Sequence, residues 1–473
     1  MTQPRTTGGR RRTATRRGRL NLTMVLAVVL PLLSVAALLL VRPAEPAATT
    51  RPPERTTLTT ATLVCPAGLP GAPELALTTV SDDVDGSVRV GLGKDAKDAG
   101  LVSGRVTTTR APDAVAVTGE DDSAPGLVAG RGGGDEPAVT ACLPPAAGQW
   151  FTGVGAGASH RSVLELTNPD GGTAVADVTV LGRNGVVEAP RLRGVSVPGG
   201  SSVRLDLATL VPRTDELALE VVTARGRLGV ALLDRFDRPG RAPLTQDWLP
   251  AQPAPATSNL LLGLAPGTGQ RTLAIANPGD DEVRAEVKVV DSESVFAPDG
   301  AEEIRVPPRG VARVRVSSIV NAAVGQDALG LQVTSSGPVS AALRSVVGND
   351  LSFATAGSSF DAEATVLVPK QPAEGRGAAR RRVVLAGATT AGTVTVVALD
   401  ANGDRLRRRT AEVVPDRGTV VKVPPTARLI SVLPERTSVT GAVLTSSANG
   451  ASMLPLTVPV RNGLVPDVRP GLP

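Results

Sequence analysis

The chain has 473 residues, with one His, two Cys, two Trp, five Phe, no Tyr and a formal net charge of +5. Its length is enough for roughly two to four domains of ordinary size. Seven arginines and no acidic residue lie within residues 1–19, so residues 20–473 carry a net charge of −2. The excess of positive charge is therefore confined to a short tail. Because the rest has no net positive field and few aromatic side chains for base stacking, we expect no nucleic-acid partner.

A long uncharged stretch follows this tail. Residues 20–41 (LNLTMVLAVVLPLLSVAALLLV) contain no charged side chain and are about as long as a bilayer-spanning helix. The preceding arginines favour a cytoplasmic N-terminus. We therefore predict a basic cytoplasmic tail at 1–19, a transmembrane helix at 20–41 that acts as an uncleaved signal anchor, and an extracytoplasmic remainder. A cleaved signal peptide is the alternative, but the following RPAEPAA offers no good cleavage site.

Two features mark the start of the exported part. Residues 42–62 are rich in Pro, Thr and Ala, a composition that predicts an unfolded stalk. The two cysteines, Cys65 and Cys142, most simply form one disulfide in an oxidising compartment. Two buried free thiols are the alternative. We expect the disulfide to close a β-module at residues 63–147, which differs from the rest in the manner of a terminal repeat.

Beyond residue 147 the chain repeats. LELTNPDGGTAVADVTVLGRNG begins at Leu164, and LAIANPGDDEVRAEVKVVDSES begins 109 residues later at Leu273. VVLAGATTAGTVTVVALDANGD at Val383 keeps the strand pattern without Asn-Pro. Farther along each copy come VPGGSSVRLDL, VPPRGVARVRV and VPDRGTVVKV, and then a last apolar segment, LALEVV, LGLQVT or VTGAVL. Such self-similarity predicts repeated structural units.

The periodicity within each copy is two. From Val283 to Val290, Val and Ala alternate with Arg284, Glu286 and Lys288. This alternation is typical of half-buried antiparallel strands, and Asn-Pro and Gly-rich turns separate them. About seven short strands in about 100 residues match an immunoglobulin-like sandwich. We predict an all-β chain of tandem immunoglobulin-like sandwiches at 148–250, 256–362 and 365–461, with a tail at 462–473. One larger solenoid or propeller is the alternative.

One segment resembles a known family. CLPPAAGQWFTGVGAGASHRSVLELTNP, residues 142–169, follows a Cys-Pro start at Cys65, an uncharged span and an arginine-rich tail. This combination is similar to a family of single-pass exported actinobacterial proteins known only as a domain of unknown function. The resemblance implies a cell-envelope setting. It brings no activity, cofactor or catalytic residue with it.

The residues give no catalytic signature. The single histidine, His160, excludes HExxH zinc sites, and no Gly-x-Ser-x-Gly elbow accompanies it, so we expect a solvated or capping side chain. The acidic clusters at residues 82–85 and 280–282 lack EF-hand spacing and are expected to be solvated turns. We predict no catalytic, cofactor-binding or metal-binding residues and no small-molecule cofactor.

These observations favour a structural or interaction protein over an enzyme. We expect a membrane-anchored extracytoplasmic protein that binds or positions an envelope partner, either a protein or a polysaccharide, through sandwich surfaces. The alternative is a carbohydrate-binding accessory or carbohydrate-active enzyme that acts on cell-wall polysaccharide. A groove with an exposed Trp150 and a pair of carboxylates would favour that alternative, because sugar sites use aromatic platforms and paired acids.

Overall fold

The computed structural model describes residues 22–40, 54–132, 137–238, 240, 242–370 and 379–465. It divides into two units, of which Arg55–Gly463 is one compact body of β-sandwiches. The other unit contains helix α1 (Leu22–Leu40), which includes Pro31. Within the described ranges, no helix meets both the length and the hydropathy needed to cross a membrane. The transmembrane part of the prediction is therefore not supported, and the tail at 1–19 lies outside the described residues.

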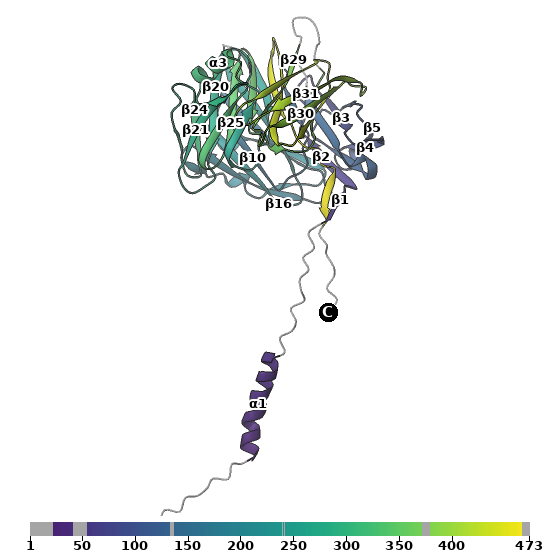
Figure 1. Ribbon diagram of the computed structural model, residues 1–473, viewed down its shortest axis with the longest axis vertical. Helices are drawn as coiled ribbons and strands as arrows, with labels where there is room; N and C mark the ends of the chain where they lie inside the picture. Colours follow the sequence, from purple (N-terminus) through teal and green to yellow (C-terminus); the bar gives the residue numbers. More distant parts are fainter. Residues whose placement is uncertain are drawn as a thin grey trace, which may run out of the picture. The chain divides into compact units, whose positions relative to one another are not determined.

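Two short strands that cross the limits of the compact unit pair with each other. β1 (Glu54–Thr57) and β36 (Asn462–Val465) form a two-stranded sheet, and the amide of Leu58 donates to the carbonyl of Arg461 at 3.1 Å. Figure 1 shows β1 beside the yellow β36. The described parts of the predicted stalk and tail are thus strands. The sequence did not indicate this because each strand is stabilised by a partner about 400 residues away, and neither has an apolar face of its own.

The first sandwich contains residues 60–141 in two four-stranded antiparallel sheets. One sheet has the order β2 (Thr60–Cys65), β7 (Val115–Glu120), β4 (Asp85–Gly91) and β5 (Lys97–Val102). The other has the order β6 (Thr107–Arg110), β3 (Glu74–Thr79), β8 (Leu127–Gly132) and β9 (Val139–Ala141). Short 3-10 turns lie at Gly93–Asp95 and Asp121–Ser123. Leucine and valine side chains from both sheets, together with Cys65 and Cys142, form the core between them.

The second sandwich, residues 148–249, repeats this strand order. β10 (Gly148–Ala156), β16 (Arg213–Arg225), β12 (Ala174–Gly182) and β13 (Gly185–Val187) run in that order, with β14 (Val195–Val197) also on β12. Opposite them lie β15 (Ser201–Asp206), β11 (His160–Asn168), β17 (Gly229–Arg238) and β18 (Ala242–Leu249). Between strands lie a 3-10 turn, Pro190–Leu192, and the short helix α2 (Leu207–Leu210). A bridge between β10 and β11 connects the two halves.

The third sandwich, residues 256–355, has one strand that belongs to both sheets. β25 (Gly330–Val347) first pairs with β19 (Ala256–Leu262) and β21 (Val283–Val290), and then with β20 (Gly269–Ala276) and β26 (Asp350–Thr355). The remaining elements are edge strands and one helix: β22 (Val295–Phe296), β23 (Ile304–Val306), β24 (Val311–Arg315) and α3 (Ser317–Gly325). The apolar residues of β21 are buried and its Arg284 and Glu286 are exposed, which confirms the period-two prediction there.

The fourth sandwich, residues 359–455, has the same order again. One sheet has the order β28 (Ala364–Leu367), β33 (Leu429–Glu435), β30 (Gly392–Leu399) and β31 (Arg405–Val413). The other has the order β32 (Thr419–Val423), β29 (Arg380–Ala386), β34 (Val439–Ser447) and β35 (Gly450–Pro455), and β27 (Ser359–Phe360) also pairs with β34. Here β33 occupies the place of β16. The segment VTGAVL, which we aligned with LALEVV, lies in β34 and occupies the place of β17.

The strands of each sandwich can be numbered alike if the edge strands beside the third strand (β5, β13, β14, β22, β23 and β31) and β27 are left out and β25 counts as two. Strands one, five and three then form one sheet, and strands four, two, six and seven form the other. In an immunoglobulin domain the first two strands share a sheet with the fourth and fifth. The all-β antiparallel prediction is confirmed, but the immunoglobulin-like part is not, because strand two lies in the other sheet. The first sandwich shares this order, although its sequence does not show the repeat. The division into separate domains stays a prediction.

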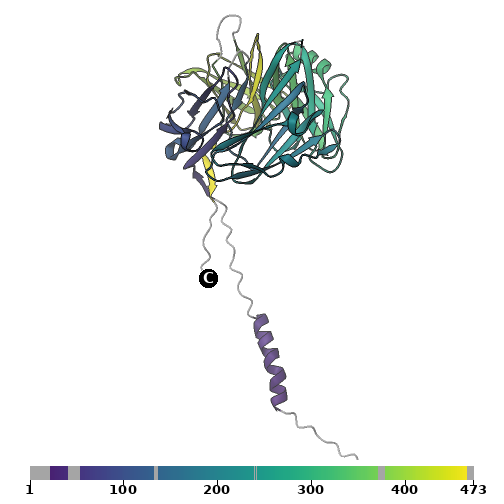
Figure 2. The same cartoon turned by 180° about the vertical axis from the view of Figure 1, so that it is seen from behind.

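The four sandwiches pack in a ring within the compact unit. Their last strands, β9, β18, β26 and β35, each contact the last strand of both neighbouring sandwiches. Figures 1 and 2 both show the purple and blue strands of the first sandwich beside the yellow-green strands of the fourth. The apolar cores continue from one sandwich into the next. Phe353 of the third packs in the core of the second, and Met453 of the fourth packs in the core of the third.

Candidate functional site

A buried cluster of charged side chains lies where the second and third sandwiches meet. His160, at the start of β11, has Nε2 2.9 Å from Asp234 Oδ2 on β17 and Nδ1 3.2 Å from Glu216 Oε2 on β16. Arg344, from β25 of the third sandwich, donates from Nη2 to Glu216 Oε1 at 2.6 Å. Its guanidinium also lies 4.9 Å from the ring centre of Phe236. The cluster therefore pairs opposite charges across the joint between two sandwiches.

The electrostatics hold His160 and Glu216 in their charged forms. Burial alone would lower the pKa of His160, but the charge and hydrogen bond of Asp234 and the nearby Glu216 raise it to about 9. Burial would raise the pKa of Glu216, but His160 and Arg344 lower it to about 2. At neutral pH His160 is therefore a cation between two carboxylates.

This geometry does not suit general-base catalysis. A base needs a free ring nitrogen directed at the proton it removes, whereas both nitrogens of His160 face carboxylates. Ser162 donates to Asp234 and accepts from the amide of Gly155 at 2.9 Å, so its hydroxyl group is also occupied by hydrogen bonds within the protein. The expectation of a solvated or capping histidine was wrong. The sequence could not show this, because the acidic partners lie 56 and 74 residues away along the chain.

Apolar side chains surround the same joint. Trp150 packs with Leu181 and Ala218 of the second sandwich and with Ala274, Ala276 and Val311 of the third. Trp150 is 7% exposed and Trp248 is 3% exposed. Neither tryptophan offers an open face to a sugar ring, so the groove with an exposed Trp150 that would favour carbohydrate binding is not observed.

The structure places the other singled-out residues as follows. Cys65, at the end of β2, and Cys142, just after β9, form a disulfide that links the two sheets of the first sandwich. The acidic residues of the clusters at 82–85 and 280–282 are exposed. Among the residues that the structure describes, no three His, Cys, Asp or Glu side chains are grouped so that they could hold a metal ion.

The repeated Asn-Pro pairs have a shared structural role. The Asn168 side chain donates to the carbonyl of Gly172 at 2.7 Å and accepts from the amide of Asp170 at 3.0 Å. Asn277 donates to the carbonyl of Asp281 at 2.7 Å and accepts from the amide of Gly279 at 2.9 Å. Both amides are fully buried. They satisfy the backbone of the turn that joins two sheets, which explains why the motif recurs.

Buried arginines are a feature that the sequence analysis missed. Arg271 on β20 is opposite Ser345, and Arg381 on β29 is opposite Thr445, at equivalent places in the third and fourth sandwiches. Arg271 donates to the carbonyls of Ala265 and Gly267, both at 2.7 Å. Burial lowers the pKa of each guanidinium to about 10. The sequence did contain a sign of these buried arginines. In two aligned copies an arginine stands two residues before the repeated apolar segment, Arg271 before Leu273 and Arg381 before Val383.

A groove of about 700 Å³ lies between the first and second sandwiches. One wall is the segment 66–71 with Pro73, Arg110 and Pro112, and the other is the outer surface of the sheet that contains β11, β15, β17 and β18. The second wall presents Glu165, Arg204 and Arg235. Binding pockets for small molecules usually have volumes of about 300–1,000 Å³, so the groove is large enough for a ligand.

Comparison with known proteins identifies the family. Residues 90–424 match a family of unknown function (DUF5719), more than two thirds of the chain. The chain belongs to this family. The resemblance to a domain of unknown function seen in the sequence is thereby confirmed. A search of curated proteins found no match.

The DUF5719 match covers parts of all four sandwiches. It begins in β4 of the first and ends just after β32 of the fourth. The charged cluster around His160 and the groove arginines Arg110, Arg204 and Arg235 lie inside it. Cys65 and the 66–73 wall of the groove lie outside it. Both sites are therefore built mainly from DUF5719 residues.

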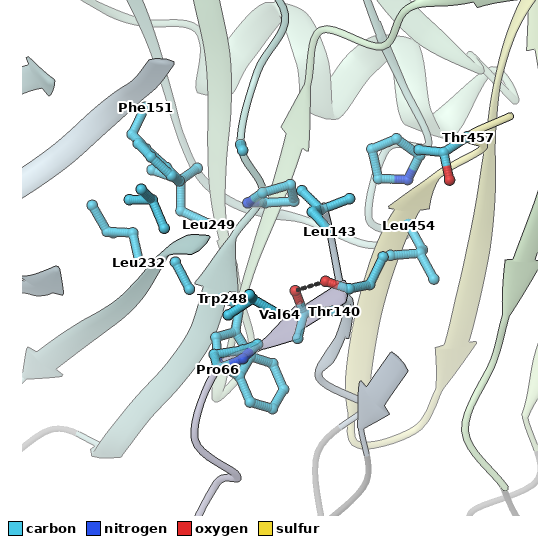
Figure 3. A pocket seen from close by; sticks show the side chains of 16 residues that line it. Val64, Pro66, Thr140, Leu143, Phe151, Leu232, Trp248, Leu249, Leu454 and Thr457 are labelled. Atoms are coloured by element: carbon cyan, nitrogen blue, oxygen red, sulfur yellow. Dashed lines mark hydrogen bonds between the residues drawn. The ribbon is translucent and has the colours of Figure 1, made fainter. Parts of the chain in front are cut away.

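A smaller apolar cavity lies where the first, second and fourth sandwiches of this DUF5719 chain meet. Figure 3 shows it lined by side chains that include Val64, Leu232, Trp248, Leu249 and Leu454. Its volume of about 70 Å³ holds no more than a few water molecules. It is too small for a sugar or a peptide.

Proposed function

We propose that this DUF5719 protein is a membrane-anchored extracytoplasmic scaffold that binds or positions a cell-envelope partner through the surfaces of its sandwich ring. The observation that carries the proposal is the continuity of the apolar cores. Phe353 and Met453 each pack in the core of the neighbouring sandwich. Packing of this kind opposes independent movement of the sandwiches. A rigid body with grooves at its joints suits recognition of a partner.

The anchor and location are parts of the same proposal and are supported by the sequence. Seven arginines before an uncharged stretch of 22 residues at 20–41 favour a cytoplasmic tail and an exported remainder. The disulfide Cys65–Cys142 is consistent with an oxidising compartment. Helix α1 occupies most of the stretch.

Topology is tested by a reporter that is active only outside the cytoplasm, fused after Pro473 in the full chain. We expect the fusion to be active and to sediment with membranes. A soluble product that begins after residue 41 would contradict the anchor. An inactive reporter on a stable fusion would contradict export.

The scaffold role is tested by single substitutions in the full chain. A scaffold distributes recognition over a surface, whereas loss of one catalytic group typically lowers a rate by orders of magnitude. We expect Asp177→Asn, which alters an exposed carboxylate that accepts from the amide of Gly194 at 2.8 Å, to leave the cellular phenotype of the protein intact. An exported, folded Asp177→Asn variant with a null phenotype would favour an enzyme instead.

Deletion of a whole sandwich is a poor test of this role. Removal of residues 257–360 would expose Leu444 and Met453 of the fourth sandwich and the core of the second, because the third sandwich covers them. The expected result is misfolding and not a specific loss of binding. In-cell crosslinking from exposed positions on the intact ring is the sharper experiment for finding the partner.

A further inference from the structure

The groove between the first and second sandwiches has an excess of positive charge. Three arginines and one glutamate line it, namely Arg110, Arg204, Arg235 and Glu165. The rest of the lining consists mainly of proline, glycine and apolar side chains. Residues 20–473 as a whole carry a net charge of −2, so the groove departs locally from the charge of the exported part.

The carboxylate of the glutamate already has two partners within the protein. Glu165 Oε1 accepts from Arg204 Nε at 2.7 Å, and its Oε2 accepts from the amide of Ala67 at 2.8 Å. Through these bonds Glu165 fixes the 66–71 wall against β11. Its charge therefore neutralises Arg204, and it forms no ion pair with the two other arginines.

The two other arginines, Arg110 and Arg235, are not ion-paired with any described residue, although Glu74 on β3 lies opposite Arg110 in the strand pairing. The buried Nε of Arg235 has no hydrogen-bond partner among the described residues. Arg235 is on β17, beside Leu233 and the buried Trp248 in the lining, and Arg110 is on β6 of the first sandwich. Because the Nε of Arg235 is buried, an anion in the groove would be bound by the terminal nitrogens of the guanidinium group.

We propose that this groove binds a carboxylate or phosphate group of the envelope partner, with Arg110 and Arg235 as the direct ligands. Guanidinium groups bind both kinds of oxyanion through paired N–H donors. The two walls come from different sandwiches, so the site exists only when the ring is assembled. This inference rests on the proposed scaffold function and names the chemistry that the scaffold recognises.

The test is titration calorimetry of the purified full chain at low ionic strength with two anionic probes. Tripolyphosphate represents the phosphate source, and triglutamate represents the carboxylate source. Triglutamine, which has the same backbone and termini but no side-chain carboxylates, is the control. We expect one of the anionic probes to bind, with an affinity that falls as salt is added, because exposed charge pairs are screened over about 10 Å at 0.1 M salt.

Three variants locate the binding. Arg235→Gln and Arg110→Gln should each weaken the bound probe by about tenfold or more, the loss expected for a charged hydrogen bond. Arg193→Gln removes the same charge from an exposed position of the second sandwich outside the groove lining, and should change the affinity less than about twofold. Because Arg110 is exposed, its variant remains informative if Arg235→Gln fails to fold.

The outcomes separate this inference from the scaffold proposal. Absence of binding by both anionic probes at low salt, or equal binding by Arg110→Gln and wild type, would overturn the anion site. If the groove variants also retain in-cell crosslinking to a partner, the scaffold role stands and only the anion site is wrong. Loss of probe binding together with loss of crosslinking in Arg110→Gln supports both.

Discussion

Arg344 and Glu216 form a buried ion pair between the third and second sandwiches, with 2.6 Å between Nη2 and Oε1. Their side chains are 3% and 4% exposed. Removal of one partner from such a pair leaves an uncompensated buried charge and typically costs about 3–5 kcal/mol. The pair thus connects the stability of two sandwiches that are more than 100 residues apart in the chain.

We predict that Arg344→Met lowers the free energy of unfolding by about 3–5 kcal/mol in urea denaturation. The exposed pair Arg284–Glu303, at 3.7 Å within the third sandwich, provides the control. Arg284→Met should cost less than about 1 kcal/mol, because surface ion pairs contribute little. Equal costs for the two variants would show that the buried pair is not formed.

Stability should fall as pH rises through the titration of His160. The pKa of His160 is raised from 6.5 to about 9 in the folded protein. The stabilisation is therefore complete below pH 6.5 and lost as pH rises to 9, by roughly 3 kcal/mol for one group. Urea midpoints measured between pH 6 and pH 9.5 in about half-unit steps should decline across this window.

The matched variant for this experiment is His160→Gln, which keeps hydrogen-bonding capacity but cannot ionise. It should be less stable than wild type at pH 6, and its urea midpoint should change less with pH between 6.5 and 9. A wild-type profile without this decline, or the same decline in His160→Gln, would mean that the histidine is not a cation between Glu216 and Asp234.

Loss of the disulfide should destabilise the first sandwich. Cys65 and Cys142 are separated by 77 residues in the sequence. In the chain-entropy model, closure of a loop of this length stabilises the folded state by roughly 4–5 kcal/mol. A Cys65→Ala/Cys142→Ala variant should show a lower melting temperature by differential scanning calorimetry. Peptide mass spectrometry without reduction should find the two cysteines linked, and free alkylation of both would refute the bond.

Adjacent positions of β21 should respond differently to the same substitution. Val287 is 7% exposed, and Val287→Asp buries an unpaired charge at a cost of several kcal/mol. The side chain of Lys288 is directed to the other face of the strand, and Lys288→Asp should cost about 0.5 kcal/mol or less. Urea denaturation of the two variants makes the comparison, and equal effects would contradict the strand's orientation.

Sequence periodicity predicted the orientation of a strand best where one face of that strand is exposed. β21 alternates between buried and exposed residues, because only one of its faces packs on a core. In β26 and β28 every residue is buried, because these strands are packed on both faces near the ring centre or against a neighbouring sandwich. Alternation disappears there, so periodicity could not distinguish the inner face from the outer one.

By itself the sequence determined the all-β class, the 109-residue repeat, the turn role of Asn168 and Asn277 and the single possible disulfide. These are local patterns or follow from the count of one residue type. Tertiary structure decided the assignment of strand two to the opposite sheet, the closure of the ring, the pairing of β1 with β36 and the burial of His160 between two carboxylates. Each of these depends on which segments distant in sequence meet in space. Local periodicity indicates whether a residue is buried, but it does not indicate which distant segment packs against that residue.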